Sequence, residues 1–77
     1  MGGFVQEALH ALPKIMLSGR NELVVENSAG ICEFGEGSIT LRTSEGALVI
    51  TGEKLTILCA ERDSVAISGK ISSVSYI

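Results

Sequence analysis

Apolar and polar residues alternate in short stretches along this chain, and that alternation constrains the fold more than any other feature. In the clearest stretch, 38–43, Ile39, Leu41 and Thr43 point to one side and the residues between them to the other. A period of two indicates a strand with one buried face. The same period recurs in 22–26 (Leu23, Val25), 54–59 (Leu55, Ile57, Cys59) and 64–68 (Val65, Ile67).

Glycine-containing or charged segments separate these stretches and indicate tight turns. Asn27-Ser28-Ala29-Gly30 fits a type I turn, and Ser44-Glu45-Gly46 fits a hairpin loop with a positive φ at the glycine. Gly52-Glu53 and Gly69-Lys70 each fit the centre of a type II′ turn, and 61–63 is a polar break. Since no connection is long enough for a parallel crossover, we expect an antiparallel meander whose first strand is 14–19.

The alternation fails after Gly69, because an odd number of positions separates Ile71 from Val74 and from Tyr76. A β-bulge near Ser72-Ser73 returns all three to one face. An ordinary strand with Ile71 on the opposite face is the alternative, and the sequence leaves both open.

The expected fold is all-β: a small antiparallel two-sheet β-sandwich over 14–77, with a half-open small β-barrel as the alternative. A sheet with an apolar face must cover it, and the sequence predicts no substantial helix that does so. Residues 1–13 predict a short N-terminal arm or helical turn, with Phe4 and Ala8 at i, i+4 spacing before Pro13. A chain of 77 residues buries a modest core, so self-association is a natural source of further stability.

Two stretches are apolar on both faces, which predicts a second buried surface. They contain Leu48-Val49-Ile50 and Ile57-Leu58-Cys59. We hypothesise that Val49 and Leu58, with Val24 as a weaker candidate, line a homo-oligomer interface, a dimer being favoured. The alternatives are central strands of the monomer's own fold, or single exposed aliphatics that need no explanation.

Residue types that carry chemistry are scarce, so we expect a protein that is not an enzyme, with no catalytic, metal or cofactor site. His10 is the single histidine and Asp63 the single aspartate, and both are expected to be solvated polar residues. Cys32 and Cys59 lie far apart and form no Cys-x-x-Cys pair. We expect them to be small buried hydrophobes, with a disulfide or a reactive thiol as the alternatives.

Charge and hydropathy narrow the expected partners and location. The net charge of −3 and six singly scattered Lys and Arg residues argue against nucleic-acid binding. No apolar run approaches the roughly 20 residues of a membrane-spanning helix, and the N-terminus lacks the pattern of a secretory signal. We therefore expect a cytoplasmic protein without direct membrane insertion.

Taken in order, the segments resemble the YabP/YqfC sporulation protein family. The resemblance begins with Leu12-Pro13-Lys14-Ile15, Leu17-Ser18-Gly19, Glu22-Leu23-Val24-Val25-Glu26-Asn27, Gly30-Ile31 and Phe34. It continues with Ile39, Leu41, Thr43, Gly46, Leu48-Val49-Ile50, Gly52, Leu55, Ile67-Ser68-Gly69-Lys70-Ile71 and Val74-Ser75-Tyr76. It covers nearly all of the chain from Leu12, and its specificity lies in the order and spacing of these pieces.

The resemblance implies a small β-sandwich protein that acts during endospore formation, in the mother-cell cytoplasm, without enzymatic activity. It also implies a membrane protein of the same programme as a partner. Asn27 and Gly30 are expected to be turn-forming positions of the family motif. The family often has a histidine after that asparagine, and this chain has Ser28, so a role for that imidazole does not transfer. We expect a scaffold that binds itself and other proteins. The alternative is a regulatory adaptor or small-ligand module with a pocket near Phe34 and Tyr76.

Overall fold

Six antiparallel strands make up the described part of the molecule. The computed structural model describes residues 12–77, and within that range it has no helix. The strands are β1 (Lys14–Ser18), β2 (Glu22–Glu26), β3 (Gly30–Phe34), β4 (Ser38–Thr43), β5 (Gly46–Glu61) and β6 (Ser64–Tyr76). They form one open sheet in the order β1-β2-β6-β5-β4-β3. The predicted all-β class is confirmed, but one sheet does not confirm the two-sheet sandwich, and the predicted N-terminal arm lies largely in residues 1–11, outside the described residues.

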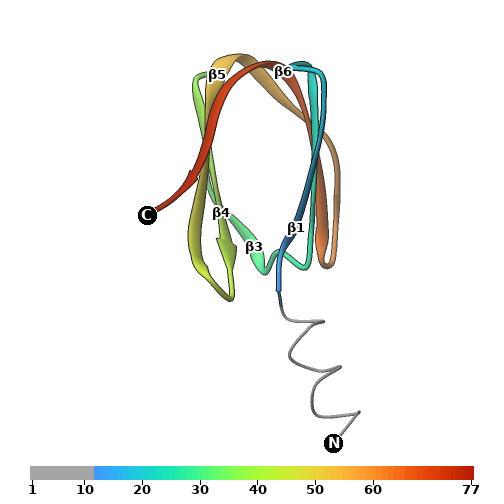
Figure 1. Ribbon diagram of the computed structural model, residues 1–77, viewed down its shortest axis with the longest axis vertical. Coiled ribbons are helices and arrows are strands. Elements are labelled where there is room, and N and C mark those ends of the chain that lie inside the picture. The colour runs from blue at the N-terminus through green and yellow to red at the C-terminus, as the bar shows by residue number, and fades with distance from the viewer. Residues whose placement is uncertain (1–11) are drawn as a thin grey trace, which may run out of the picture.

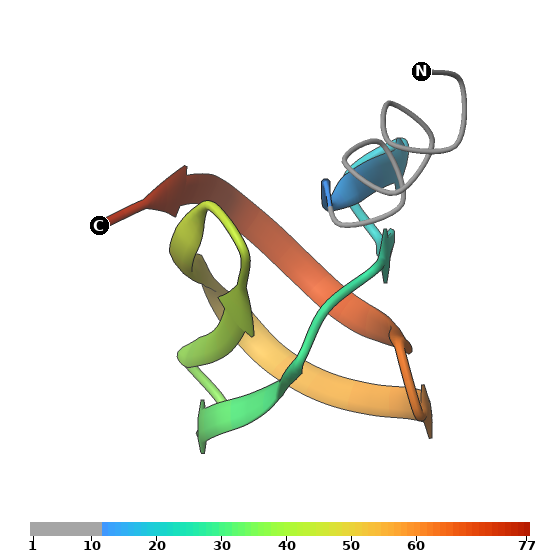
Figure 2. The ribbon, with the colours of Figure 1, turned by 90° about the horizontal axis from the view of Figure 1, so that it is seen from below.

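The single sheet covers its own apolar face because its two longest strands bend. Residues 46–51 of β5 pair with β4, whereas residues 56–61 pair with the part of β6 that also pairs with β2. β5 and β6 therefore cross from one half of the sheet to the other, and the two halves face each other (Figure 1). The view along the long axis shows the same two halves, with the segment between β2 and β3 crossing between them (Figure 2).

The crossing point corrects two predicted turns. Gly52-Glu53 and Gly69-Lys70 form no hairpin turns, because β5 and β6 continue through them. Each glycine lies against the other strand: a Cβ on Gly52 would overlap the carbonyl oxygen of Lys70, and a Cβ on Gly69 would lie 2.7 Å from the carbonyl oxygen of Lys54. The glycines thus permit close approach of two backbones, which is a second common reason for glycine inside a strand.

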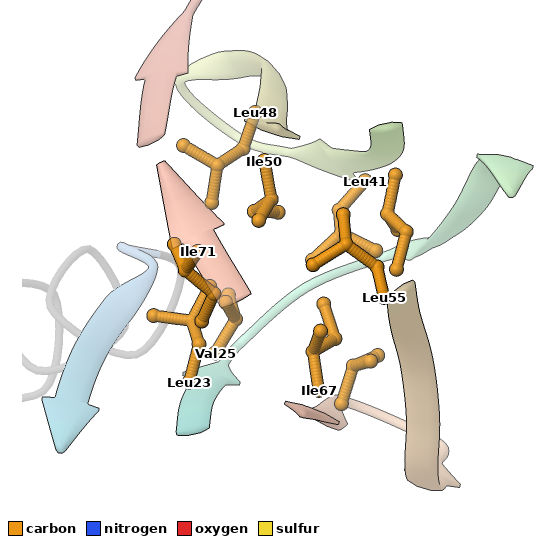
Figure 3. Packing of buried hydrophobic residues seen from close by; sticks show 10 residues of the cluster. Leu23, Val25, Leu41, Leu48, Ile50, Leu55, Ile67 and Ile71 are labelled. Atoms are coloured by element: carbon orange, nitrogen blue, oxygen red, sulfur yellow. The ribbon is translucent and has the colours of Figure 1, made fainter. Parts of the chain in front are cut away.

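The core lies between the two halves and consists of aliphatic side chains from four strands, β2, β4, β5 and β6 (Figure 3). Its ten members are Leu23, Val25, Ile39, Leu41, Leu48, Ile50, Leu55, Val65, Ile67 and Ile71. The alternation predicted in 22–26, 38–43 and 64–68 is confirmed, since each apolar set in those stretches is buried. Thr43 completes its set, and its hydroxyl donates to the carbonyl oxygen of Gly46 at 2.7 Å, which closes the predicted Ser44-Glu45-Gly46 hairpin.

Extra residues in three strands change which face the following residues occupy. The register between β5 and β6 shifts opposite Ser72, so Ile71 and Val74 both belong to the core side, and of the two alternatives that the sequence left open the structure has the bulge. A second shift at Leu58 places Cys59 opposite Ala66, away from the face of Leu55. The prediction that Cys59 shares a buried face is therefore wrong. A third shift lies beside Cys32 in β3, a strand that the sequence pattern did not reveal because Ile31 and Phe34 are an odd number of residues apart.

The segment between β2 and β3 joins the two halves, so it is no hairpin turn. β2 and β3 do not pair, and the predicted type I turn is replaced by a crossing link. The amide of Asn27 donates to the carbonyl oxygen of Asp63 at 2.6 Å, and the amide of Ala29 donates to that of Arg42 at 2.7 Å. Asn27 and Gly30 nevertheless have the positive φ angles of turn-type residues, 66° and 148°.

Candidate functional site

Side chains that could take part in catalysis or bind a metal ion are scattered over the described structure. Cys32 and Cys59 are free and exposed, so the prediction that they are buried hydrophobes is wrong. Their position beside register shifts explains this exposure, because a bulge turns a residue out of the buried series. Asp63 lies in the turn between β5 and β6 and anchors the crossing link through its backbone, while His10 lies outside the described residues. Within residues 12–77, no three His, Cys, Asp or Glu residues are grouped so that they could hold a metal ion.

The three residues predicted to self-associate are divided between the two halves of the sheet. Val24 pairs with Met16 on β1 and with Ala66 on β6, and Ala66 pairs with Cys59 on β5. These four residues form a row across one outer face, which we call the outer row, and Leu58 is the extra residue beside its end. Val49 pairs with Thr40 and Ser75, so it lies on the outer face of the other half.

The edge strand β1 exposes more large hydrophobic residues than any other strand of the described structure. All five of its residues are exposed, and the central three are Ile15, Met16 and Leu17. Ile15 and Leu17 pair with Val25 and Leu23, so they belong to the core-facing side, yet 37% and 52% of their surface is exposed. The opposite half of the sheet therefore does not extend far enough to cover β1. The sequence predicted this strand but not its exposed apolar surface; its three consecutive apolar residues, the pattern used for Leu48-Val49-Ile50, were the signal that could have revealed it.

β1 is held at both ends, and among residues 12–77 no strand pairs with its outer edge. Its five residues pair with β2 in continuous register. At one end, the carbonyl oxygens of Arg20 and Asn21 accept hydrogen bonds from the amides of Ile71 (2.9 Å) and Gly69 (3.1 Å). At the other end, the Asn27 side-chain amide donates to the carbonyl oxygen of Leu12 at 2.8 Å. A strand fixed at both ends presents its unpaired backbone groups in an ordered array.

The other edge of the sheet, β3, differs in two respects. Its register with β4 is interrupted between Ile31 and Glu33, and Glu33 places an exposed charge in the strand. Bulges and charges are devices that make an edge unsuitable for pairing with another strand. Phe34 is 57% exposed here, so apolar surface alone does not distinguish the two edges. Backbone regularity does distinguish the two edges, and by this criterion β1 is better suited than β3 to pair with another strand.

A groove of about 540 Å³ opens beside β1. Leu17 and Arg20 line it on the β1 side, and Lys70, Ile71 and Val74 line it on the β6 side, together with Glu53 from β5. Neither Phe34 nor Tyr76 lines this groove, so it is not the pocket that the sequence predicted. Its mixed charges and aliphatic floor make it an amphipathic surface continuous with the exposed face of Leu17.

The fold and its exposed edge describe a small β protein whose most distinctive surface suits contacts with other chains. The YabP family model matches residues 10–77, which is most of the chain. An uncharacterised Bacillus subtilis (strain 168) protein named YqfC is 29% identical over 66 residues, covering 86% of this chain and 71% of that protein. The chain belongs to the YabP family, the sporulation-associated YabP/YqfC group that its segments resemble. No helix among the described residues is long and apolar enough to span a membrane.

Proposed function

We propose that the protein is a non-enzymatic scaffold of endospore formation that acts through contacts with further copies of itself and with other proteins. Its family membership supports the process. The observation that carries the scaffold role is β1, an ordered and regular strand edge whose residues Ile15, Met16 and Leu17 are all exposed. Strand addition at such an edge supplies backbone hydrogen bonds for affinity and alternate side chains for specificity.

The expected setting is the cytoplasm of the mother cell, where one partner is a membrane protein of the same programme. The described strands include two edges, β1 and β3, of which β1 is the regular one. A scaffold of this size needs two separate contacts, one for its own kind and one for the partner. The outer row and the groove beside β1, which extends from Leu17 along β6 to Val74, are two such surfaces.

The test is genetic and biochemical. In a spore-forming host, deletion of the gene is expected to lower the yield of heat-resistant spores and leave vegetative growth unchanged. Crosslinking of the tagged protein in sporulating cells is expected to join it to second copies and to one membrane protein. A matched pair of variants, Met16→Lys on β1 and Ile31→Lys on β3, separates the β1 edge from a general effect of added charge. Normal spore yield after deletion, with no crosslinked partner, would contradict the proposal.

The groove supports a second candidate, a regulatory adaptor that binds a small amphipathic ligand. Arg20 and Lys70 offer two cations beside the aliphatic side chains of Leu17 and Val74. Pockets that bind small molecules combine an apolar lining with a few polar groups in this way. A thermal shift produced by one metabolite class, and abolished by Lys70→Ala with the fold retained, would favour this candidate. The absence of any such shift would leave the scaffold as the better account.

A further inference from the structure

The two free edges of the sheet are not equivalent, and their difference points to a specific partner. β3 carries a bulge and a charge, whereas β1 pairs with β2 in unbroken register and has no charge between Lys14 and its end at Ser18. Natural sheets protect exposed edges with inward charges, bulges or proline, because an unprotected edge pairs with other strands. β1 lacks these devices in its central residues. An edge left unprotected and held in place at both ends is suited to receive a strand.

The strand that fits must be apolar on both of its faces. Met16 lies in the outer row and is 39% exposed, while Ile15 and Leu17 face the core side and are also uncovered. A polar strand, or a strand that is apolar on one face only, would place polar side chains beside Met16 or beside Ile15 and Leu17. β1 itself has the required pattern, because its three central residues are apolar and its ends are Lys14 and Ser18.

We propose that β1 pairs with β1 of a second copy of this chain, in antiparallel orientation about a two-fold axis at Met16. The inference rests on the proposed scaffold function and names the surface through which the protein binds itself. In this register, Met16 lies opposite Met16 of the second copy, and Ile15 lies opposite its Leu17. Lys14 lies opposite Ser18 of the second copy, so no like charges oppose each other. A two-fold axis requires such self-complementarity of a single surface.

The register centred on Met16 has independent support from the rest of the sheet. The outer row runs from Met16 through Val24 and Ala66 to Cys59, and polar rows flank it on both sides. Pairing at Met16 joins the outer rows of the two copies into one continuous apolar row across eight strands. A register displaced by one residue would instead place the core-facing Ile15 and Leu17 beside residues of the outer face, because the side-chain period of a strand is two.

The electrostatic surroundings suit the same arrangement. In its own sheet, Lys14 lies opposite Glu26, and Ser18 lies opposite Glu22. Across the new pair, the order of these side chains becomes Glu26, Lys14, then Ser18 and Glu22 of the second copy. Each lysine therefore keeps Glu26 of its own chain beside it and has the neutral Ser18 of the second copy on its other side. The arrangement brings no like charges directly opposite each other at either end of the paired strands.

The test is a charge exchange at the two-fold axis, read by size-exclusion chromatography with light scattering over a range of protein concentrations. Wild-type protein is expected to dimerise. Met16→Lys and Met16→Glu each place like charges directly opposite one another, so each alone is expected to weaken dimerisation by about tenfold or more. An equimolar mixture of the two variants places Lys opposite Glu and is expected to restore the dimer. Ile31→Lys on the other edge strand, β3, is the matched control, because Ile31 is 38% exposed against 39% for Met16, and it is expected to dimerise as wild type does.

A crosslinking measurement tests the same register without added charge. In a Cys32→Ser, Cys59→Ser background, Met16→Cys is expected to form a disulfide-linked dimer on mild oxidation. Directly opposed residues in an antiparallel pair have Cα atoms about 4.5–5.5 Å apart, within the range that a disulfide spans. Ile15→Cys is the control, since its own counterpart lies two positions away along the strand, and it is expected to crosslink poorly.

The outcomes separate this inference from the wider proposal. A wild-type dimer that persists in both charged variants, or that crosslinks equally at Met16→Cys and Ile15→Cys, overturns the β1 pairing and leaves self-association to another surface. A wild-type protein that is monomeric at every concentration overturns the β1 pairing and the self-association part of the scaffold role together. Dimers lost in both single charged variants and recovered in their mixture establish β1 and its register.

Discussion

Gly52 is the position at which the bent sheet is most sensitive to a single methyl group. A Cβ at Gly52 would overlap the carbonyl oxygen of Lys70 and would lie 3.0 Å from its carbonyl carbon and 3.1 Å from the Cα of Ile71. All three atoms belong to the backbone of β6, so no side chain can rotate away. Gly52→Ala therefore forces β5 and β6 apart at the point where both cross between the halves.

The expected loss of stability follows from that geometry. Overpacking against a fixed backbone costs typically 1–3 kcal/mol, and local backbone strain costs a further 1–3 kcal/mol per residue. We expect a loss of about 3 kcal/mol or more. A domain of this length has a free energy of unfolding of roughly 4–12 kcal/mol, so Gly52→Ala removes a large fraction of it. For a domain of this size, the corresponding fall in Tm is roughly 12–24 °C.

Gly37→Ala is the matched control for this experiment. Its nearest neighbour would be the carbonyl oxygen of Gly52 at 3.8 Å, an ordinary contact, and its φ is not in the positive range. We expect its free energy of unfolding to stay within about 1 kcal/mol of wild type. Urea unfolding followed by far-UV circular dichroism, at one protein concentration for all variants, measures both changes. If Gly52→Ala unfolds within 1 kcal/mol of Gly37→Ala, the close approach of β5 and β6 is wrong.

Three further changes test other parts of the structure. Gly69→Ala is expected to destabilise more than Gly19→Ala, because both have positive φ but only Gly69 faces backbone atoms within 3 Å; equal urea midpoints would contradict this. Leu41→Ala should cost about 2–5 kcal/mol by opening a cavity in the core, whereas Leu58→Ala on the surface should stay within about 0.5 kcal/mol; similar losses in thermal unfolding would count against the assigned core. Asn27→Ala should cost about 1–2 kcal/mol and Asn27→Gly less, since both lose the hydrogen bond to Leu12 but glycine accepts φ 66°; the reverse order would contradict the left-handed conformation at this position.

The alternation of side chains predicts much of this fold from the sequence. Leu23, Val25, Ile39 and Leu41 are buried as the period of two requires, whereas the odd spacing between Ile71 and Val74 left a bulge and an ordinary strand open, and the structure has the bulge. These features are local, because a strand's pleat fixes which side chains share a face regardless of what covers them. The same locality explains why the hairpin at 44–46 was predictable from its glycine.

Such local patterns do not predict contacts between segments that are far apart in the sequence. Gly52-Glu53 and Gly69-Lys70 have the composition of hairpin turns, yet each glycine is required by the other strand's backbone. Cys59 left its predicted face because of a bulge at Leu58 that no sequence period reveals. The sequence pattern also did not reveal that Val24 and Val49, which it grouped in one hypothetical interface, lie on different halves of the sheet. Pairing across the sheet decides these placements, and it depends on the whole chain.

The way this sheet covers its own core also explains why β1 is left open. A sheet that bends onto itself has only as many strands in each half as its chain provides, and its edge strands need cover from the opposite half. Leu23 and Val25 on β2 are fully buried, whereas their direct neighbours Leu17 and Ile15 on β1 are not, so the cover ends between these two strands. A closed barrel would remove the edge, and a polar strand would make its exposure harmless. β1 has neither remedy, and its apolar residues account for a substantial share of the apolar surface that the fold leaves in water. A protein of this length gains stability by burying such a strand against another chain. The charged variants at Met16 are therefore expected to affect both self-association through β1 and the proposed scaffold function.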